Sequence, residues 1–467
     1  MVNSLISEAE ELKQRIYGLE KQLLAAAIEW ARNTYKAILE QLDLFIQRYR
    51  AKVFSIEHKR STWFRTWLGP IRITRRQYRD RDGKYHYLLD ELLGMKKYHH
   101  TTAAVQEIAL ELAGTLTFRK SAEILRKTTA IDLSSQTIHR LLRRAADGCI
   151  DSTDRETDWF QETGELTQTE GEKIGRLMIE ADGVMLSLQR EKARKTEVKL
   201  GITYEGWNKV GKDRYSTVNK TVYADIAGTD RFWARMTLKL HEKYDLSGIK
   251  EFVIGGDGAG WIKEGVDYFG GTYQLCRYHL NRELCHALGH NSDTLRSVQG
   301  CCNRGEFDTA LVLLKEAADK AKGDKGQDIR RAIRYISSNA DGLKDHREDA
   351  GLTDKNLRRT GAIEGNIDKL IVRRMKNQGM SWTRQGIRRM LWLRISIHEG
   401  TLPDCLLSRN NETVPPIAPT KRVNHVIDRA IKYDYTNYFS AGLPAISGPH
   451  ASRPWVELLK SLTRVVI

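Results

Sequence analysis

Cysteine, proline and long apolar runs are all scarce in this chain of 467 residues. Charged residues interrupt every apolar run well before the ~20 residues that span a bilayer, and the N-terminus lacks the features of a signal peptide. Six scattered cysteines are too few for a disulfide framework, so we expect reduced thiols. These absences exclude a disulfide-rich secreted protein and a membrane protein. They indicate a globular, cytoplasmic chain of several domains.

Acidic residues are in the minority. The chain has 76 Lys and Arg against 60 Asp and Glu, a formal net charge of +16. Residues 51–150 contain 19 basic and 10 acidic residues, and residues 351–400 contain 11 and 4. Basic charge clustered in this way is typical of a protein that binds a polyanion. A solvated basic surface on an ordinary protein is the alternative.

The stretch from Leu177 to Trp207 predicts neighbouring strands of one sheet, because short apolar runs are separated by turn signals. The first run ends in Glu180-Ala181-Asp182-Gly183. We therefore expect Asp182 at the end of a buried strand, where metal ligands and catalytic acids of α/β sheets are commonly found. Because Asp-Gly is also the commonest hairpin signal, a turn aspartate is the alternative.

A second apolar run repeats this pattern. Glu251–Ile254 leads into Gly255-Gly256-Asp257-Gly258. Two strands that each deliver an aspartate to the same end of a sheet can hold divalent metal between them. Carboxylate oxygens suit Mg²⁺ or Mn²⁺, and two such ions can stabilise the attacking and the leaving oxygen of a phosphoryl transfer.

A third carboxylate, Glu364, is expected to complete this set. It lies near a predicted helix start, where the macrodipole favours an ionised carboxylate. An apolar stripe that includes Ile363 and Ile367 would dock the helix against the sheet. Asp354 and Asp368 are the rival ligands, and an ordinary surface glutamate is the alternative. A basic run downstream is expected to hold a DNA backbone beside the metals, through Arg373, Arg374, Lys376, Arg384, Arg388 and Arg389.

Several of these segments together resemble one known family, the ISLre-type insertion-sequence transposases, which are related to the Mutator-like transposases. The segments are Glu180–Gly183, Glu197–Gly201, Tyr204–Trp207, Gly256–Gly258, Cys276–His279 and Gly361–Asn366. The resemblance covers roughly residues 1–395. It implies an RNase H-like fold, a catalytic triad of Asp182, Asp257 and Glu364 with two Mg²⁺ (or Mn²⁺) ions, and DNA transposition. It also implies double-stranded DNA partners, namely terminal inverted repeats and target DNA, and a homo-oligomer on DNA.

Cys276 and His279, with Cys285 and His286 beyond them, also invite a zinc hypothesis. All four fall on or near one helix, which cannot wrap a tetrahedral ion, and no second ligand pair lies at a finger-like distance. The resemblance instead implies that Cys276 and His279 are auxiliary residues near the active site.

Two motifs in the first third predict DNA contacts. Residues 71–88 predict a basic β-hairpin with a two-residue Asp82-Gly83 turn. Its candidate contacts to a DNA backbone are Arg72, Arg75 and Arg76. Residues 117–142 predict a helix-turn-helix with Ser134 or Ser135 as the N-cap. Its second helix would present Ser135, Gln136, His139 and Arg140 to DNA. A helical pair that only packs is the alternative.

We predict a multidomain α+β/α chain, with an RNase H-like mixed-sheet domain preceded by the helical and β-hairpin DNA-binding region. The predicted divisions are a helical segment at 1–50, the DNA-binding region at 51–150, an acidic linker at 151–172, the catalytic domain at 173–289 and 356–398, a helical insertion at 290–355, and an irregular, proline-marked tail at 399–467. The expected function is a DNA transposase in the cytoplasm, associated with the nucleoid. The alternatives are a catalytically silent DNA-binding protein and a nuclease that cuts without joining.

Overall fold

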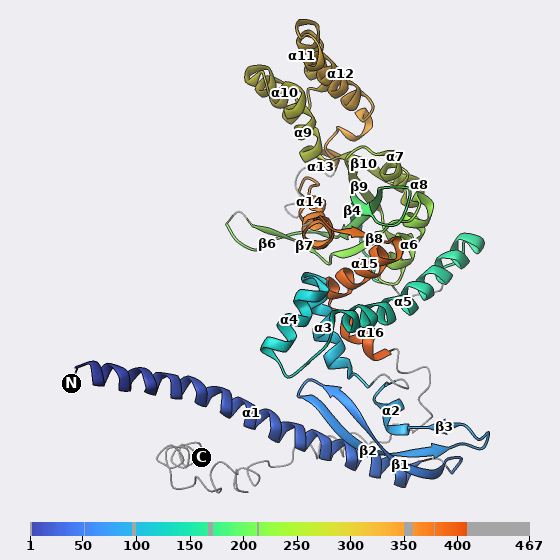
Figure 1. The fold of residues 1–467 in the computed structure, drawn as a ribbon. Helices are drawn as coiled ribbons and strands as arrows, with labels where there is room; N and C mark the ends of the chain where they lie inside the picture. The colour runs from blue at the N-terminus through green and yellow to red at the C-terminus, as the bar shows by residue number, and fades with distance from the viewer. Residues whose placement is uncertain are drawn as a thin grey trace. The chain divides into compact units, whose positions relative to one another are not determined.

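The computed structural model describes residues 2–50, 52–95, 100–166, 171–212, 214–349, 358–377 and 379–408 (Figure 1). The chain divides into two compact units, whose described parts lie within residues 1–100 and 101–409. The predicted DNA-binding region 51–150 is therefore split at residue 100, because its hairpin and its helices belong to different cores. Most of the predicted tail, beyond residue 408, lies outside the described residues.

The first unit is a small antiparallel sheet packed against a long helix. Helix α1 (Val2–Tyr49) precedes β1 (Ser55–Thr66), β2 (Gly69–Arg79), β3 (Tyr85–His86) and the short helix α2 (Leu88–Leu92). The strand order is β1-β2-β3. Leu39 and Ile46 of α1 share a buried core with Phe64, Ile71 and Ile73 of the sheet. The predicted helical segment at 1–50 is confirmed as one continuous helix.

The β2–β3 hairpin lies where the sequence predicts it, but its loop is longer. Arg79 pairs with Tyr85, and the Asp80 amide donates to the Lys84 carbonyl, so the loop encloses three residues rather than two. Gly83 adopts φ +81°, which favours glycine. Strand β1 was not predicted, because its first residues are mostly polar and exposed and give no apolar alternation.

The second unit begins with three helices that pack on the same core as its sheet. These are α3 (Ala103–Thr115), α4 (Phe118–Thr128) and α5 (Ser135–Thr163). Leu110, Leu125 and Leu142 from the three helices belong to one buried cluster with Leu186 and Leu200 of the sheet. A helix pair joined by a short turn is present at the predicted place, and Ser134 caps α5 by accepting from the Thr137 amide.

A six-stranded mixed sheet forms the centre of the second unit. Its main path runs in the order β10-β9-β4-β5-β8. Strand β4 pairs antiparallel with β5, which pairs antiparallel with β8. Strand β9 runs parallel to β4, and β10 runs parallel to β9. The two-residue β11 (Ser381–Trp382) pairs parallel with the end of β4. The five main strands are β4 (Arg176–Leu188), β5 (Lys195–Tyr204), β8 (Thr221–Asp225), β9 (Glu251–Gly256) and β10 (Thr272–Leu275).

Smaller elements connect these strands. Strands β6 (Gly206–Lys209) and β7 (Tyr215–Val218) form a separate hairpin between β5 and β8. Helix α6 (Thr229–His241) and the turn η1 (Leu246–Gly248) lead from β8 to β9, and α7 (Gly260–Lys263) and α8 (Gly265–Phe269) lead from β9 to β10.

The two faces of the sheet are covered by different helices. Side chains alternate between the faces of a strand, and Leu177 and Ile179 of β4 pack with Phe232 and Trp233 of α6. Met178 and Val184 belong instead to the cluster that includes the helices after residue 360. Glu180 and Asp182 share this second face, because they are an even number of residues from Met178.

A helical module follows β10, as the sequence predicts. It consists of α9 (Arg277–Leu288), α10 (Ser292–Arg304), α11 (Phe307–Lys320) and α12 (Asp324–Ser337), followed by η2 (Ala340–Gly342) and α13 (His346–Asp349). Leu284, Val298, Leu314 and Ile329 give it a core of its own. The module begins earlier than predicted, because α9 starts beside the sheet and continues into the module without a break.

The chain then returns to the sheet through a second group of helices. Helix α14 (Ile363–Ile367) continues into a π-helical segment η3 (Asp368–Lys376), and α15 (Arg384–Glu399) and α16 (Leu402–Ser408) follow β11. Thr383 caps α15 by accepting from the Gly386 amide. Residues 402–408 are therefore helical, although they fall within the predicted irregular tail.

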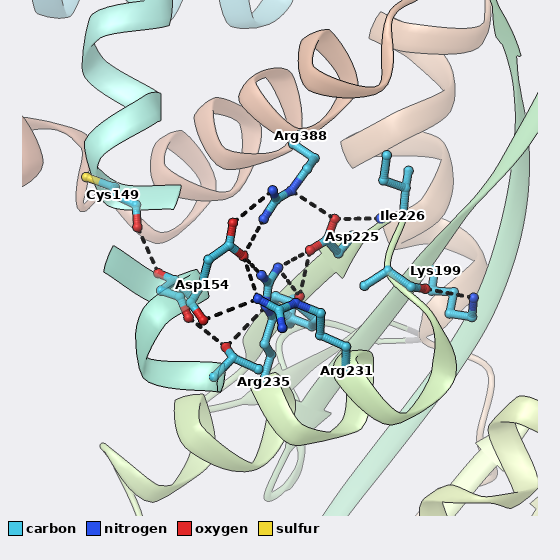
Figure 2. Close-up of polar contacts among 12 residues, drawn as sticks. Cys149, Asp154, Lys199, Asp225, Ile226, Arg231, Arg235 and Arg388 are labelled. Carbon is cyan, nitrogen blue, oxygen red and sulfur yellow. Dashed lines mark hydrogen bonds and ion pairs between the residues drawn. The ribbon is translucent and has the colours of Figure 1, made fainter. Parts of the chain in front are cut away.

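The acidic stretch 151–172 is not a linker over its first half. Residues 151–163 are the second half of α5, and Figure 2 shows Arg231, Arg235 and Arg388 gathered around Asp154. Asp154 pairs with all three guanidinium groups. Asp225 at the end of β8 pairs with Arg235 and Arg388. Complementary charge therefore holds α5 against α6 and α15, which composition alone does not reveal.

The arginines of the basic run on α15 form ion pairs of the same kind. Arg384 pairs with Glu191, Arg388 with Asp154, and Arg389 with Asp147 through two hydrogen bonds. These arginines are thus paired with acidic side chains of the same unit, and their contact with a DNA backbone stays a prediction.

All six cysteines are free thiols, in agreement with the expectation from their spacing. None of the helices in the described part of the chain combines the length and the apolar character that crossing a bilayer requires.

Asp154→Ala is expected to lower the free energy of unfolding by about 2 kcal/mol. Removing one partner of a buried ion pair costs about 3–5 kcal/mol, and Asp154 is itself partly exposed, which reduces the effect. Arg235, which is almost fully buried, would lose one of its two carboxylate partners. Chemical denaturation measures the change. Asp151→Ala, an exposed position on the same helix, is the control; an equal loss in both variants would contradict the assignment.

Candidate active site

The three predicted carboxylates converge on one side of the sheet, although Asp182 does not end a strand. Strand β4 continues through Asp182 and Gly183 to Leu188 as a single strand, so both the strand-end and the turn interpretations of Asp182 are wrong. The neighbouring strand β9 ends before β4 does, because it pairs with β4 only as far as Glu180, opposite Gly255. Asp182 therefore lies just beyond the point where the two parallel strands part.

Asp257 follows the last residue of β9 and occupies the corresponding position on the other strand. Its Oδ1 accepts from the Ala259 amide at 2.9 Å, and its carbonyl accepts from the Tyr335 hydroxyl at 2.6 Å. The next residue, Gly258, has φ +97°, and a Cβ there would lie 2.6 Å from the Asn339 side chain. Glycine is thus required for the turn that holds Asp257 against the helical module.

Glu364 is held at the site by a buried carboxylate on β4. Glu180 is 1% exposed. It accepts hydrogen bonds from the amides of Gly361, Ala362 and Ile363 at 2.8, 3.2 and 3.1 Å, and from the Tyr204 hydroxyl. These amides lie at the start of α14, so Glu180 fixes to the sheet the helix that carries Glu364.

Cys276 and His279 line the same site from the start of α9. His279 is buried, with Nε2 3.8 Å from an Asp182 oxygen and Nδ1 3.2 Å from Glu364 Oε1. The Cys276 thiol donates to Glu364 Oε1 at 3.6 Å. The expectation that these two residues lie near the carboxylates is confirmed, and their side chains contact the predicted ligands directly.

Burial and nearby negative charge disfavour the ionisation of Asp182 and Glu364. Burial raises the pKa of Asp182 to about 6, and the charge of Asp257 adds to the shift. Burial likewise raises the pKa of Glu364 to about 7, with a further contribution from Asp182. Arg282 of α9 lowers the pKa of both groups. Like charges gathered in a poorly solvated site are typical of a centre that binds cations.

The donor set fits a hard divalent ion. Asp182, Asp257 and Glu364 offer carboxylate oxygens, which suit Mg²⁺ or Mn²⁺. The buried Nδ1 of His279 forms no hydrogen bond within the described residues, although it faces Glu364. A buried nitrogen without a hydrogen bond, beside carboxylates that repel one another, is energetically unfavourable. A bound cation and its water ligands would reduce this cost.

Zinc fits the site less well. Cys276, His279 and Glu364 do bring one possible ligand atom each within 4.8 Å of one another. However, burial raises the pKa of the Cys276 thiol to about 12, which disfavours the thiolate that zinc binds, and the thiol donates to Glu364. Cys285 is exposed, and His286 Nδ1 lies 2.8 Å from a nitrogen of Arg331.

The predicted DNA-contacting arginines divide into exposed and buried groups. Arg72 is exposed. Arg75 and Arg76 are buried and paired with Asp90 and Asp43, so their guanidinium groups serve the core of the first unit. The prediction of DNA contacts for these two is contradicted, because burial and a local carboxylate remove their charge from the surface.

A similar division applies after α14. Arg374 is buried and donates to the Ala113 carbonyl, which contradicts its predicted DNA contact. Arg373 is exposed and pairs with Asp368 at 2.7 Å, and Lys376 is exposed. On α5, Gln136 and Arg140 are exposed and Ser135 is partly exposed. The His139 ring contacts Phe118 edge-on.

Glu180 and Arg282 are the site residues that sequence reasoning missed. Glu180 could have been predicted because it is two residues before Asp182, which places both side chains on one face of β4. Arg282 lies one helical turn beyond His279, on the same side of α9. It is exposed and forms no salt bridge within the described residues. The three-residue spacing between His279 and Arg282 on α9 is the only signal in the sequence that points to Arg282.

The family model for UPF0236, an uncharacterised protein family, matches residues 10–405. The chain therefore belongs to this family. A UPF0236 protein of Caldanaerobacter subterraneus subsp. tengcongensis, whose name joins eleven locus designations, is 28% identical over 84% of this chain and 78% of its own length. Another from that organism, whose name joins four, is 26% identical over the same shares. A relative from Streptococcus gallolyticus, named for the 3′ region of vanSb, is 26% identical over 85% of this chain and 86% of its own.

Glu180→Gln is expected to loosen the start of α14 without unfolding the sheet. The glutamine amide would present N–H donors to a group of N–H donors, so some of the three backbone hydrogen bonds would be lost. Hydrogen exchange should become at least several-fold faster at the amides of Gly361, Ala362 and Ile363. Glu191→Gln, at an exposed ion pair on the β4–β5 loop, is the matched control. Unchanged exchange in Glu180→Gln would show that its carboxylate does not hold the helix.

Proposed function

We propose that this protein is a DNA transposase that uses divalent metal, held by Asp182, Asp257 and Glu364, to cleave and join DNA strands. The observation that carries the proposal is that carboxylates from β4, the end of β9 and α14 lie at one partly buried site. His279 lies within 3.8 Å of Asp182 and 3.2 Å of Glu364, and the charge of Asp257 contributes to the raised pKa of Asp182. The raised pKa values of Asp182 and Glu364 support a site adapted to cations.

The proposed fold of the catalytic domain is RNase H-like. Its support is the strand order β10-β9-β4-β5-β8, with the first three strands in sequence antiparallel and the last two parallel to β4. In this interpretation α9–α12 are an insertion after the fifth strand, and α14 supplies the last acid. The proposed acids lie on the first strand, after the fourth strand and on the returning helix.

Two bound Mg²⁺ or Mn²⁺ ions would activate a water or 3′-hydroxyl nucleophile and stabilise the leaving oxygen. Asp182 and Asp257, on parallel strands, would hold cations at the place where the strands part. Glu364 would close the site from the helix side, and Glu180 would set its position. Arg282, exposed beside these groups, is suited to orient a DNA phosphate, since its guanidinium offers a planar set of donors.

The first unit offers a surface suited to a DNA backbone. Trp63 of β1 pairs with Arg72 of β2, and Arg65 follows on the same face of the hairpin. All three are exposed, while Phe64 and Ile71 point into the core. An exposed face that alternates aromatic and arginine side chains is typical of phosphate and base contacts. In the second unit, Gln136 and Arg140 at the exposed start of α5 would read the element ends.

The names of the relatives are in keeping with a mobile element. One relative's name joins eleven locus designations of a single genome and another's joins four. Several loci that share one protein name within a single genome are what repeated copying or movement of a DNA segment would leave behind. The proposed partners are therefore terminal inverted repeats and target DNA in the nucleoid.

Two rival functions use the same surfaces. A catalytically silent DNA-binding protein would not need three acids at one site, two of them, Asp182 and Glu364, with raised pKa values. An RNase H-like nuclease would share the chemistry and would release cut DNA without joining it. Incubating the purified protein with element ends, target DNA and Mg²⁺ separates all three, since only a transposase yields both cleaved and joined products.

In that assay, Asp182→Asn, Asp257→Asn and Glu364→Gln are each expected to reduce cleavage by at least about 10²-fold, because each deletes a charged ligand while keeping the side-chain shape. DNA binding, measured by gel shift, should change little. Asp368→Asn is the matched control, since Asp368 lies one turn from Glu364 but pairs with Arg373. Cleavage within a few-fold of wild type in any of the three variants would remove that residue from the site.

A further inference from the structure

Helix α1 carries two different apolar stripes on opposite faces. Its second half packs on the sheet of the first unit through Tyr35, Leu39, Leu42 and Ile46. Its first half repeats apolar residues at alternating intervals of three and four, at Ile16, Leu19, Leu23, Ala26 and Trp30. At about 100° per residue, Leu23 lies roughly 160° around the axis from Leu39. The first stripe therefore faces away from the sheet that the second stripe covers.

Several side chains of the first stripe are exposed to solvent. Ile16 is 54% exposed and Leu23 is 45% exposed, and Figure 1 draws this half of α1 extending beyond the sheet of its own unit. Upstream, the sequence keeps the same spacing at Val2, Leu5, Ala9 and Leu12. An apolar 3,4 repeat sustained over four heptads is characteristic of a coiled coil.

We propose that the first half of α1 forms a parallel, in-register, two-stranded coiled coil with a second copy of this chain. The stripe assigns Ile16, Leu23 and Trp30 to heptad position a, and Leu19 and Ala26 to position d. Upstream in the sequence, Val2 falls at a, and Leu5 and Leu12 fall at d. Ala9 is also at a, so two of the five a positions, Val2 and Ile16, are β-branched, and three of the four d positions are leucine. β-Branched residues at a combined with leucine at d favour two parallel strands over higher states.

Charge complementarity selects a copy of the same helix in the same direction. In a parallel pair, position g of one helix faces position e of the other five residues further along. By sequence, Glu8 at g faces Lys13 at e, and Arg15 at g faces Glu20 at e. Both pairs unite opposite charges, and each occurs twice in a symmetric dimer. This inference does not depend on the proposed function, since it rests on residues outside the candidate active site.

The test is the oligomeric state of the full-length protein, measured by sedimentation equilibrium or light scattering without DNA. Wild type is expected to be dimeric. Leu23→Asp, which buries a charge at the centre of the seam, is expected to raise the dimer dissociation constant at least about 100-fold. Ala25→Asp introduces the same charge on the outward face two residues away and is expected to leave the dimer intact. Circular dichroism verifies that all variants remain folded.

A monomeric wild type, a dimeric Leu23→Asp, or equal dissociation of Leu23→Asp and Ala25→Asp would each overturn the proposal. A wild type of three or more chains that dissociates with Leu23→Asp would overturn the two-stranded state.

A charge swap tests direction and register. Glu20→Lys places two like-charged pairs in the parallel dimer and is expected to weaken it several-fold, and adding Arg15→Glu to the same chain restores opposite charges and should recover the affinity. Weakening without recovery would exclude the parallel, in-register arrangement.

Discussion

The candidate site depends on the buried carboxylate of Glu180. A carboxylate removed from water is strongly unfavourable unless hydrogen bonds replace its hydration, and here the Tyr204 hydroxyl and three amides at the start of α14 supply them. The three amides in turn need an acceptor, because they are at a helix start and have no partners within the helix. Satisfying Glu180 therefore brings α14 to β4 and brings Glu364 to Asp182, across 182 positions of sequence.

The same arrangement makes the metal-free site electrostatically unfavourable. Asp182 and Glu364 have pKa values raised to about 6 and about 7, while the unfolded chain would ionise both near pH 4. Between about pH 4 and pH 7 the folded state thus binds more protons than the unfolded state, so these groups reduce stability as pH rises through that window. Above it, both carboxylates are ionised and close together, which favours a divalent cation. The ion pairs of Asp154 and Asp225 with arginines, by contrast, are neutralised within the protein and hold the surrounding helices in place.

The sequence predicts the parts of this structure that are marked by local patterns. Strands with apolar runs, the long first helix, the helices of the insertion and the three acids are all recognisable from periodicity or from residues next to glycine. Strand β1 is missed because its polar first residues give no alternation. The role of Asp182 in the middle of a strand is missed because its local sequence, Asp-Gly, is also that of a turn; only the early end of β9 distinguishes the two. Arg75, Arg76 and Arg374 are predicted on the surface but are buried. Composition reveals that these residues are charged, but it does not reveal the carboxylate or carbonyl from a distant part of the chain that binds each guanidinium group.

The central claim is that Asp182, Asp257 and Glu364 form one divalent-metal site, and Mn²⁺ binding measured by electron paramagnetic resonance tests it without reference to catalysis. At pH 8 the wild-type protein should bind two Mn²⁺ ions per chain, and lowering the pH to 5.5 should weaken binding as Asp182 and Glu364 take up protons. Replacing any one of the three acids by its amide should abolish at least one of the two ions, while Asp368→Asn should retain both. Absence of Mn²⁺ binding in the wild type, or equal binding in the amide variants, would contradict the account.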